Sequence, residues 1–144
     1  MRRGLFLATS VAVLAAPALS SAADASAARI FVYRDTGCTC CEGWVAAMRS
    51  AGYAVELKDI DHEARLRRFA IPEALAGCHT AVANGYLIEG HVPIPAVAKL
   101  LRERPKTRGI TLPVMPSGTP GMPGPHTTVN VLLLDDPRRV FYME

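Results

Sequence analysis

The sequence predicts an α/β fold in which helices cover a mixed β-sheet. Three observations support this prediction. Short β-rich runs alternate with segments whose apolar residues recur at helical spacing, turn residues separate these segments, and the pair Asn84-Gly85 marks a hairpin. Residues 24–144 have the length of one compact domain with a single core.

Residues 1–23 are expected to be a secretory signal peptide. Arg2 and Arg3 supply its basic start, and an apolar stretch spans 5–16. Small residues then form a cleavage site that ends at Ala23, with a second candidate site that ends at Ala27. The apolar stretch is too short to cross a bilayer, so we expect no stable membrane insertion after cleavage. The expected location is the periplasm, and the Arg2-Arg3 pair leaves twin-arginine export open beside general secretion.

The first half of the mature chain alternates between strand and helix patterns. Trp44, Val45 and Met48 recur at helical spacing, and Gly52 is placed to end that helix. Asp61 has the side chain of a helix N-cap. The expected elements are a strand at 30–34, a helix at 41–51, a strand at 53–60 and a helix at 62–69.

The second half predicts a hairpin, a helix and a C-terminal pair of strands. Ile94, Val97 and Leu100 share one helix face, and Pro105 follows the expected end of that helix. Residues 113–125 carry five prolines and three glycines and are expected to form a surface loop. The expected strands of this half lie at 79–83, 86–89, 128–134 and 139–143.

The charge balance excludes two classes of partner. The full chain has a formal net charge of +3, and the expected signal peptide carries two of its arginines. The remaining domain is nearly neutral, which provides no electrostatic basis for binding nucleic acid or an anionic membrane surface. We therefore expect no nucleic-acid partner.

The four cysteines lie in two groups, and their spacing indicates reactive chemistry. Cys38, Cys40 and Cys41 follow the first expected strand, whereas Cys78 lies just before the hairpin. Cys38 and Cys41 have the C-x-x-C spacing of thiol–disulfide enzymes at a strand-to-helix junction, which favours a thioredoxin-like layer of helices on the sheet. Because a helix N-terminus stabilises thiolate, we predict Cys38 and Cys41 as a redox-active pair. The alternative is a structural disulfide of an exported domain.

The same sulfurs predict a soft-metal site. Three thiolates within one turn cannot easily surround a single tetrahedral zinc ion, whereas they can bridge several Cu(I) ions. We expect Cys38, Cys40, Cys41 and Cys78 to converge on copper, which is the expected cofactor. Further candidate ligands are His79, His91, Met115 and Met122.

Each candidate ligand outside the cysteines has a competing interpretation. Strand alternation turns His79 away from Cys78 unless a loop or bulge intervenes. His91 has hydrogen bonding to a loop as its alternative role. We expect the proline-rich loop to cover the cysteine site with Met115 and Met122, and the alternative is packing of these side chains elsewhere on the surface.

Four motifs, taken in order, resemble the CopG-like periplasmic copper proteins. The motifs are CTCCEGW at 38–44, GCHTA at 77–81, YLIEGHVP at 86–93 and MPSGTPGM at 115–122. The resemblance covers essentially all of the mature chain and implies a thioredoxin-like fold with a copper site linked to copper resistance. The site residues that it implies are Cys38, Cys40, Cys41 and Cys78, with His79 and His91.

The departures from this family pattern remove no sulfur. Thr39 stands where Gly or Pro is expected, and Val114 stands where Gly is expected. Relative to thioredoxin itself, no proline precedes His79, and Cys78 is expected to occupy that space. Protein substrates dock at that position in thioredoxins, so the difference argues against general disulfide exchange.

The sequence leaves three functions to be compared. The leading hypothesis is a periplasmic protein that holds Cu(I), with copper ions and other periplasmic copper-handling proteins as partners. A coupled thiol/disulfide change and Cu(I)/Cu(II) interconversion would make it a copper oxidoreductase, which stays open. The second hypothesis is a thiol–disulfide oxidoreductase acting on proteins. The third is a structural or interaction domain with inert disulfides.

Overall fold

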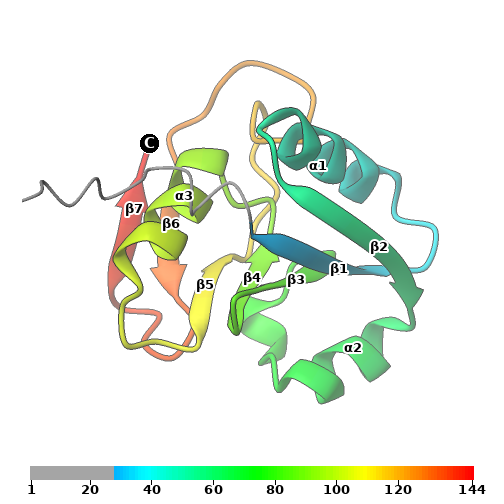
Figure 1. The fold of residues 1–144 in the computed structure, drawn as a ribbon, viewed down its shortest axis with the longest axis horizontal. Helices are drawn as coiled ribbons and strands as arrows, with labels where there is room; N and C mark the ends of the chain where they lie inside the picture. The colour runs from blue at the N-terminus through cyan, green and yellow to red at the C-terminus, as the bar shows by residue number, and fades with distance from the viewer. Residues whose placement is uncertain (1–27) are drawn as a thin grey trace, which may run out of the picture.

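The computed structural model describes residues 28–144 (Figure 1). The expected signal peptide at 1–23 lies outside the described residues. Within the described part of the chain, every helix is too short or too polar to cross a bilayer.

A seven-stranded mixed sheet forms the centre of this part of the chain. Its strands are β1 (Arg29–Asp35), β2 (Ala54–Ile60), β3 (His79–Ala83), β4 (Tyr86–Gly90), β5 (Gly109–Leu112), β6 (Asn130–Leu133) and β7 (Val140–Met143). Their spatial order is β2-β1-β3-β4-β5-β6-β7. The pairs β1–β2 and β4–β5 are parallel, and all other neighbours are antiparallel.

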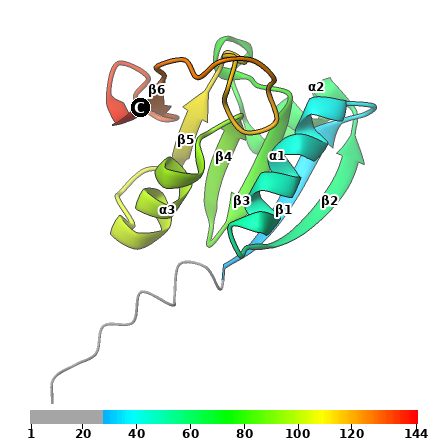
Figure 2. The same cartoon turned by 90° about the horizontal axis from the view of Figure 1, so that it is seen from above.

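Helices cover both faces of the sheet. They are α1 (Thr39–Ser50), α2 (His62–Phe69), α3 (Ile94–Glu103) and the short 3-10 helix η2 (Glu73–Leu75). Helices α1 and α3 lie on one face, and α2 lies on the opposite face (Figures 1 and 2). This arrangement is the thioredoxin-like α/β fold that the sequence predicts.

The main core lies between the sheet and helices α1 and α3. Trp44 and Met48 of α1 are fully buried in one cluster with Ile30 and Val32 of β1. Burying each apolar side chain of this size contributes about 1.5–3 kcal/mol. The indole N–H of Trp44 donates to the carbonyl oxygen of Val92 at 2.9 Å, so its polar atom is also satisfied. This packing holds the first turn of α1 against the sheet.

The structure differs from the sequence expectation at two elements. Helix α1 begins at Thr39, two residues before the expected start, because Cys38 has the extended backbone of an N-cap. Strand β5 was not expected, since its four residues show no polar alternation. All four are buried in the sheet. A Cβ atom on Gly109 would clash with the carbonyl oxygen of Leu87, so glycine is needed for the β4–β5 pairing.

Candidate metal centre

The turn between β1 and α1 places three cysteines at the start of the helix. Gly37 adopts a φ of +82°, which permits the sharp turn that ends β1. The backbone N–H of Cys38 donates to the carbonyl oxygen of Asp35 at 3.0 Å, and the guanidinium of Arg34 donates to the carbonyl oxygen of Cys38 at 3.1 Å. Cys40 and Cys41 follow within the first turn, as the sequence predicts.

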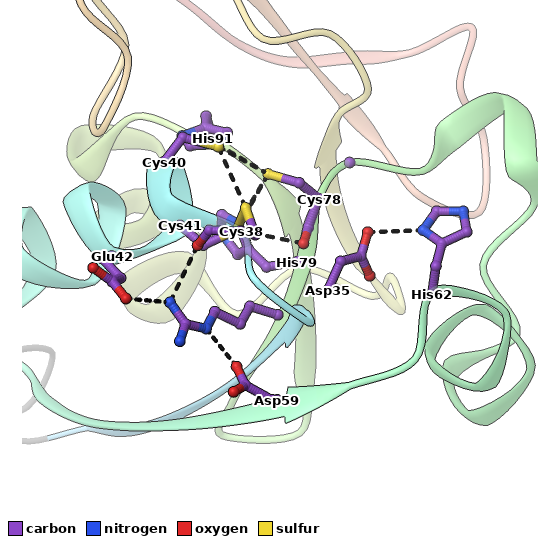
Figure 3. The surroundings of a disulfide bond; sticks show 12 residues. Asp35, Cys38, Cys40, Cys41, Glu42, Asp59, His62, Cys78, His79 and His91 are labelled. Carbon is purple, nitrogen blue, oxygen red and sulfur yellow. Dashed lines mark hydrogen bonds and ion pairs between the residues drawn. A yellow bond between two sulfur atoms is a disulfide. The ribbon is translucent and has the colours of Figure 1, made fainter.

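The four cysteine sulfurs form a closed ring, shown in Figure 3. A disulfide joins Cys38 to Cys41, whereas Cys40 and Cys78 are free. The Cys40 sulfur lies 3.4 Å from that of Cys38 and 3.8 Å from that of Cys78. The ring closes with 3.4 Å between the sulfurs of Cys78 and Cys41. The fold therefore brings together all four cysteines that the sequence singled out.

Two histidines extend this cluster around Cys78. His91 Nε2 lies 3.1 Å from the Cys78 sulfur, and His79 Nδ1 lies 3.7 Å from it. Cys78 precedes the first residue of β3, so strand alternation does not separate it from His79. Cys78, His79 and His91 have the mutual spacing of a metal-binding group.

Each of the two histidine rings points one nitrogen toward the sulfur of Cys78. His91 Nδ1 lies 2.7 Å from the carbonyl oxygen of Pro120, so Nδ1 carries the proton and Nε2 keeps its lone pair facing Cys78. His79 is fully buried, and among the described residues its Nε2 has no hydrogen-bond partner. His79 Nδ1 faces the Cys78 sulfur, whereas its buried Nε2 lacks, within the described part of the chain, the second partner that usually orients a metal-binding imidazole.

Burial keeps both imidazoles neutral. Burial, reinforced by the neighbouring His91 and Arg65, lowers the pKa of His79 to about 3. Burial also lowers the pKa of His91 below its ordinary value, against the opposing hydrogen bond to Pro120. Neutral imidazole is the form that ligates metals. At neutral pH, therefore, neither ring has to lose a proton before it binds a metal ion.

The proline-rich loop at 113–125 lies beside the cysteines, as predicted from the sequence. A Cβ atom on Gly43 of α1 would lie 2.7 Å from the Cα atom of Gly121, so the two backbones touch. Gly121 has a φ of +85°, and a Cβ atom there would lie 2.5 Å from the carbonyl oxygen of Cys40. Met122, next to this contact, is partly buried, whereas Met115 is 53 % exposed. Ligation by either methionine stays a prediction.

A buried ionic network on the α2 face holds the backbone on either side of Cys78. The Arg65 guanidinium is fully buried and donates to Asp35 Oδ1 and Glu89 Oε1, each at 2.7 Å. It also donates to the carbonyl oxygen of Gly77 at 2.6 Å. Glu89 accepts from the N–H of Gly77 at 2.8 Å, and the N–H of Asp35 donates to the carbonyl oxygen of Cys78 at 3.0 Å.

This network was not predicted from the sequence. The only local signal is a glutamate, Glu89, inside a β-rich run, because charged residues are rarely buried without a partner. Burial raises the pKa of Glu89, and the Arg65 charge opposes that rise. Arg65 and Glu89 are therefore positioning residues for Cys78, on the opposite face of the sheet from α1.

Cys78 is expected to react slowly with alkylating reagents in the metal-free protein. Burial, followed by the neighbouring Cys40 sulfur, raises the pKa of Cys78 to about 12, and only the thiolate reacts. Its alkylation rate should keep rising with pH well above about 8.5, the ordinary cysteine value. Timed iodoacetamide treatment across a pH series, with mass spectrometry of the Cys78 peptide, measures this rate. The Cys78→Ser variant is the control, and a rate that levels off near the ordinary value would contradict the burial argument.

The fold and the site together define a thioredoxin-like protein with a sulfur- and imidazole-lined candidate metal centre. Comparisons with known proteins agree with this class. Residues 75–122 match a family model described as "Protein of unknown function, DUF411". A search of curated proteins found no match.

Two solved structures match over most of the chain. One is a copper resistance protein CopG, Form 2, with 31% identity, 82% of this chain and 98% of that chain covered, and a TM-score of 0.71. The other is a copper resistance protein CopG, Form 1, with 31% identity, 81% and 96% covered, and a TM-score of 0.67. The chain belongs to the CopG family.

Proposed function

We propose that this chain is a periplasmic protein that holds Cu(I) and acts in copper resistance. The observation that carries the proposal is the ring of four cysteine sulfurs with two neutral histidines beside Cys78. Membership of a family whose solved members are named copper resistance proteins supports the same metal. The proposed ligands are Cys38, Cys40, Cys41 and Cys78, with His79 and His91.

The chemistry of this donor set fits Cu(I) better than harder ions. Thiolate sulfur and neutral imidazole are soft or borderline ligands, whereas Mg²⁺ and Ca²⁺ take carboxylate, carbonyl and water oxygens. Sulfurs spaced 3.4–3.8 Å apart can each bridge two ions rather than surround one. The Trp44 ring lies 4.7 Å from the His79 ring and supplies an apolar wall behind the site.

We further propose that the Cys38–Cys41 pair couples copper to thiol/disulfide change. Two thiols and two Cu(II) ions yield one disulfide, two Cu(I) ions and two protons. The reverse reaction consumes the disulfide, two Cu(I) ions and two protons and returns two thiols and two Cu(II) ions. The disulfide between these residues in the structure supports the existence of the oxidised form of this redox pair. The position at a helix N-terminus supports the reduced form, because the helix dipole favours thiolate over thiol.

An oxygen-free titration with Cu(I) tests the metal assignment. The reduced protein should develop near-ultraviolet charge-transfer absorbance that saturates at a fixed number of ions per chain. His126→Ala is the matched histidine control, because His126 is exposed and outside the cluster, and it should titrate like the wild type. Absence of the band in the wild type would refute copper binding by cysteine.

Export is tested separately by fractionation of cells that produce the full chain. The soluble protein should appear in the periplasm with Asp24 as its first residue, because the expected cleavage follows Ala23. Removal of residues 2–23 should retain it in the cytoplasm. Periplasmic protein that keeps its original N-terminus would contradict the signal-peptide prediction.

A thiol–disulfide oxidoreductase acting on proteins is the second candidate. The observation that favours it is the C-x-x-C disulfide at the start of α1 in a thioredoxin-like fold. Against it, no proline precedes His79, and Cys78 stands at that position with its sulfur 3.4 Å from that of Cys41. An insulin-reduction assay decides this: we expect no rate above that of free dithiothreitol alone. Resistance of the disulfide to mild reductant would instead indicate a purely structural bridge.

Replacing Met115 and Met122 with alanine is expected to speed air oxidation of bound Cu(I) and weaken its binding. The loop lies against the cysteine turn, and thioether sulfur is a soft, uncharged ligand that does not compete with protons. Met143→Ala is the matched control, because Met143 is 70% exposed on β7. Competition with a chromophoric Cu(I) chelator measures affinity. Unchanged affinity and an unchanged oxidation rate would leave the loop without a role at the site.

A further inference from the structure

The sulfur ring contains one disulfide and two free thiols. When Cys38 and Cys41 are joined, the two free thiols, Cys40 and Cys78, remain neighbours with 3.8 Å between their sulfurs. Both side chains are partly exposed, and they come from the first turn of α1 and the loop before β3. The first disulfide therefore leaves a second pair of thiols already adjacent.

We propose that Cys40 and Cys78 form a second disulfide, so that the site exchanges four electrons with copper. This inference rests on the proposed copper redox function and extends it. In the second step the thiols of Cys40 and Cys78 lose two protons and two electrons and form one S–S bond. The electrons reduce two Cu(II) ions to two Cu(I) ions, so the fully reduced protein reduces four Cu(II) in total.

The existing Cys38–Cys41 disulfide favours this pairing, because it leaves Cys40 and Cys78 as the two unbonded sulfurs of the ring. A disulfide needs a sulfur separation of about 2.05 Å, so the Cys40 and Cys78 sulfurs must approach by less than the width of one atom. Cys40 and Cys41 are adjacent in sequence and cannot bond without distorting the peptide between them. The alternative pairing, Cys38 with Cys40 and Cys41 with Cys78, has sulfur contacts of 3.4 Å and holds the same number of electrons. Fragmentation of the linked peptides in the mass spectrometer distinguishes the two pairings, because Cys38, Cys40 and Cys41 lie in one tryptic peptide.

The second disulfide removes the last thiolates from the site. With both bridges formed, the candidate ligands that remain are the imidazoles of His79 and His91 and the thioethers of Met115 and Met122, and these neutral groups are weaker partners for Cu(I) than thiolates. The singly oxidised site keeps two thiols that hold Cu(I). The doubly oxidised site releases it, so full oxidation acts as the discharge step of the copper site.

Counting electrons tests the inference. The reduced mature protein is mixed without oxygen with excess Cu(II), and a Cu(I)-specific chromophoric chelator reports the Cu(I) formed. We expect four Cu(I) per chain, no free thiol in denaturant, and loss of protein-bound Cu(I). Two Cu(I) per chain with two thiols remaining would overturn the second disulfide while leaving the proposed copper redox function intact. No Cu(I) above a thiol-free control would overturn both.

Two matched double variants assign the bridge. Cys38→Ser with Cys41→Ser leaves only Cys40 and Cys78, and it should produce two Cu(I) per chain and a disulfide-linked pair of tryptic peptides. Cys40→Ser with Cys78→Ser should also produce two Cu(I) per chain, but with its bridge inside a single tryptic peptide. Fragment-ion mapping of the oxidised wild-type chain, which locates the linked cysteine within each tryptic peptide, repeats the test without any substitution. A wild-type map in which Cys40 and Cys78 are never joined would overturn the assignment.

Discussion

A protein in which Cys40 and Cys78 are both replaced by serine is expected to lose more than half of the Cu(I) that the wild type binds. These two residues supply the free thiols of the cluster, and Cys78 also connects the sulfur ring to His91 through a 3.1 Å contact. Serine keeps nearly the same shape but places oxygen, a poor Cu(I) ligand, at both positions. The Cys38–Cys41 pair is left as the only source of thiolate.

The measurement is Cu(I) stoichiometry of the reduced protein by oxygen-free equilibrium dialysis, together with the charge-transfer absorbance. Thr39→Ala is the matched control, since Thr39 is exposed in the same helical turn and carries no sulfur. Circular dichroism and thermal unfolding show whether each variant keeps the fold. Full stoichiometry in a folded Cys40→Ser, Cys78→Ser protein would falsify convergence of the four sulfurs on copper.

Replacing Arg65 with methionine is expected to destabilise the domain by about 3–5 kcal/mol, because it leaves a buried carboxylate without its charge partner. Glu89 is fully buried, and its main charged partner, at 2.7 Å, is Arg65. Arg67 on the same helix is the matched control. Its side chain is 70% exposed in an ion pair with Glu63, so Arg67→Met should cost no more than about 0.5 kcal/mol.

The loss of stability in the Arg65→Met variant should depend on pH in a defined direction. Burial already raises the folded-state pKa of Glu89, and removing Arg65 removes the largest interaction that opposes the rise. An acid whose pKa is raised on folding binds more protons in the native state, so stability falls as pH increases through the unfolded-state value. The Arg65→Met variant should therefore lose more stability at neutral pH than in mild acid.

Urea unfolding of the metal-free, disulfide-intact proteins at mildly acidic and neutral pH measures both effects. A second variant, Arg65→Met with Glu89→Gln, removes the unpaired charge and should recover part of the loss at neutral pH. Equal destabilisation at both pH values, with no recovery in the double variant, would show that packing rather than charge dominates at Arg65.

The sequence by itself determined the elements whose signals are local. Asp61 was expected to cap α2, and its side chain accepts from the N–H of Ala64 at 3.0 Å. Asn84-Gly85 predicted the β3–β4 hairpin, and both residues adopt the positive φ that such a turn requires. The C-x-x-C spacing predicted a cysteine pair at a helix start, because residues three apart lie on the same face of one turn.

Only the tertiary structure decided how the distant parts of the site meet. Sequence spacing could group Cys78 with the other cysteines by chemical type, but the sulfur contacts arise from the β1–β3 pairing and the packing of α1. The contact of His91 with Pro120 depends on the path of an irregular loop, which has no periodicity to read.

Arg65 is the clearest example of a residue whose burial the local sequence does not predict. Its helical position reads as surface, because arginine is rarely fully buried. It is buried because Asp35, Glu89 and the Gly77 carbonyl, from three other segments, together satisfy its donors. Local signals thus determined the elements and the type of chemistry at the first turn of α1. Long-range packing decided the sulfur ring, its histidines and the ionic network beneath it, because these contacts form only when separate segments are folded together.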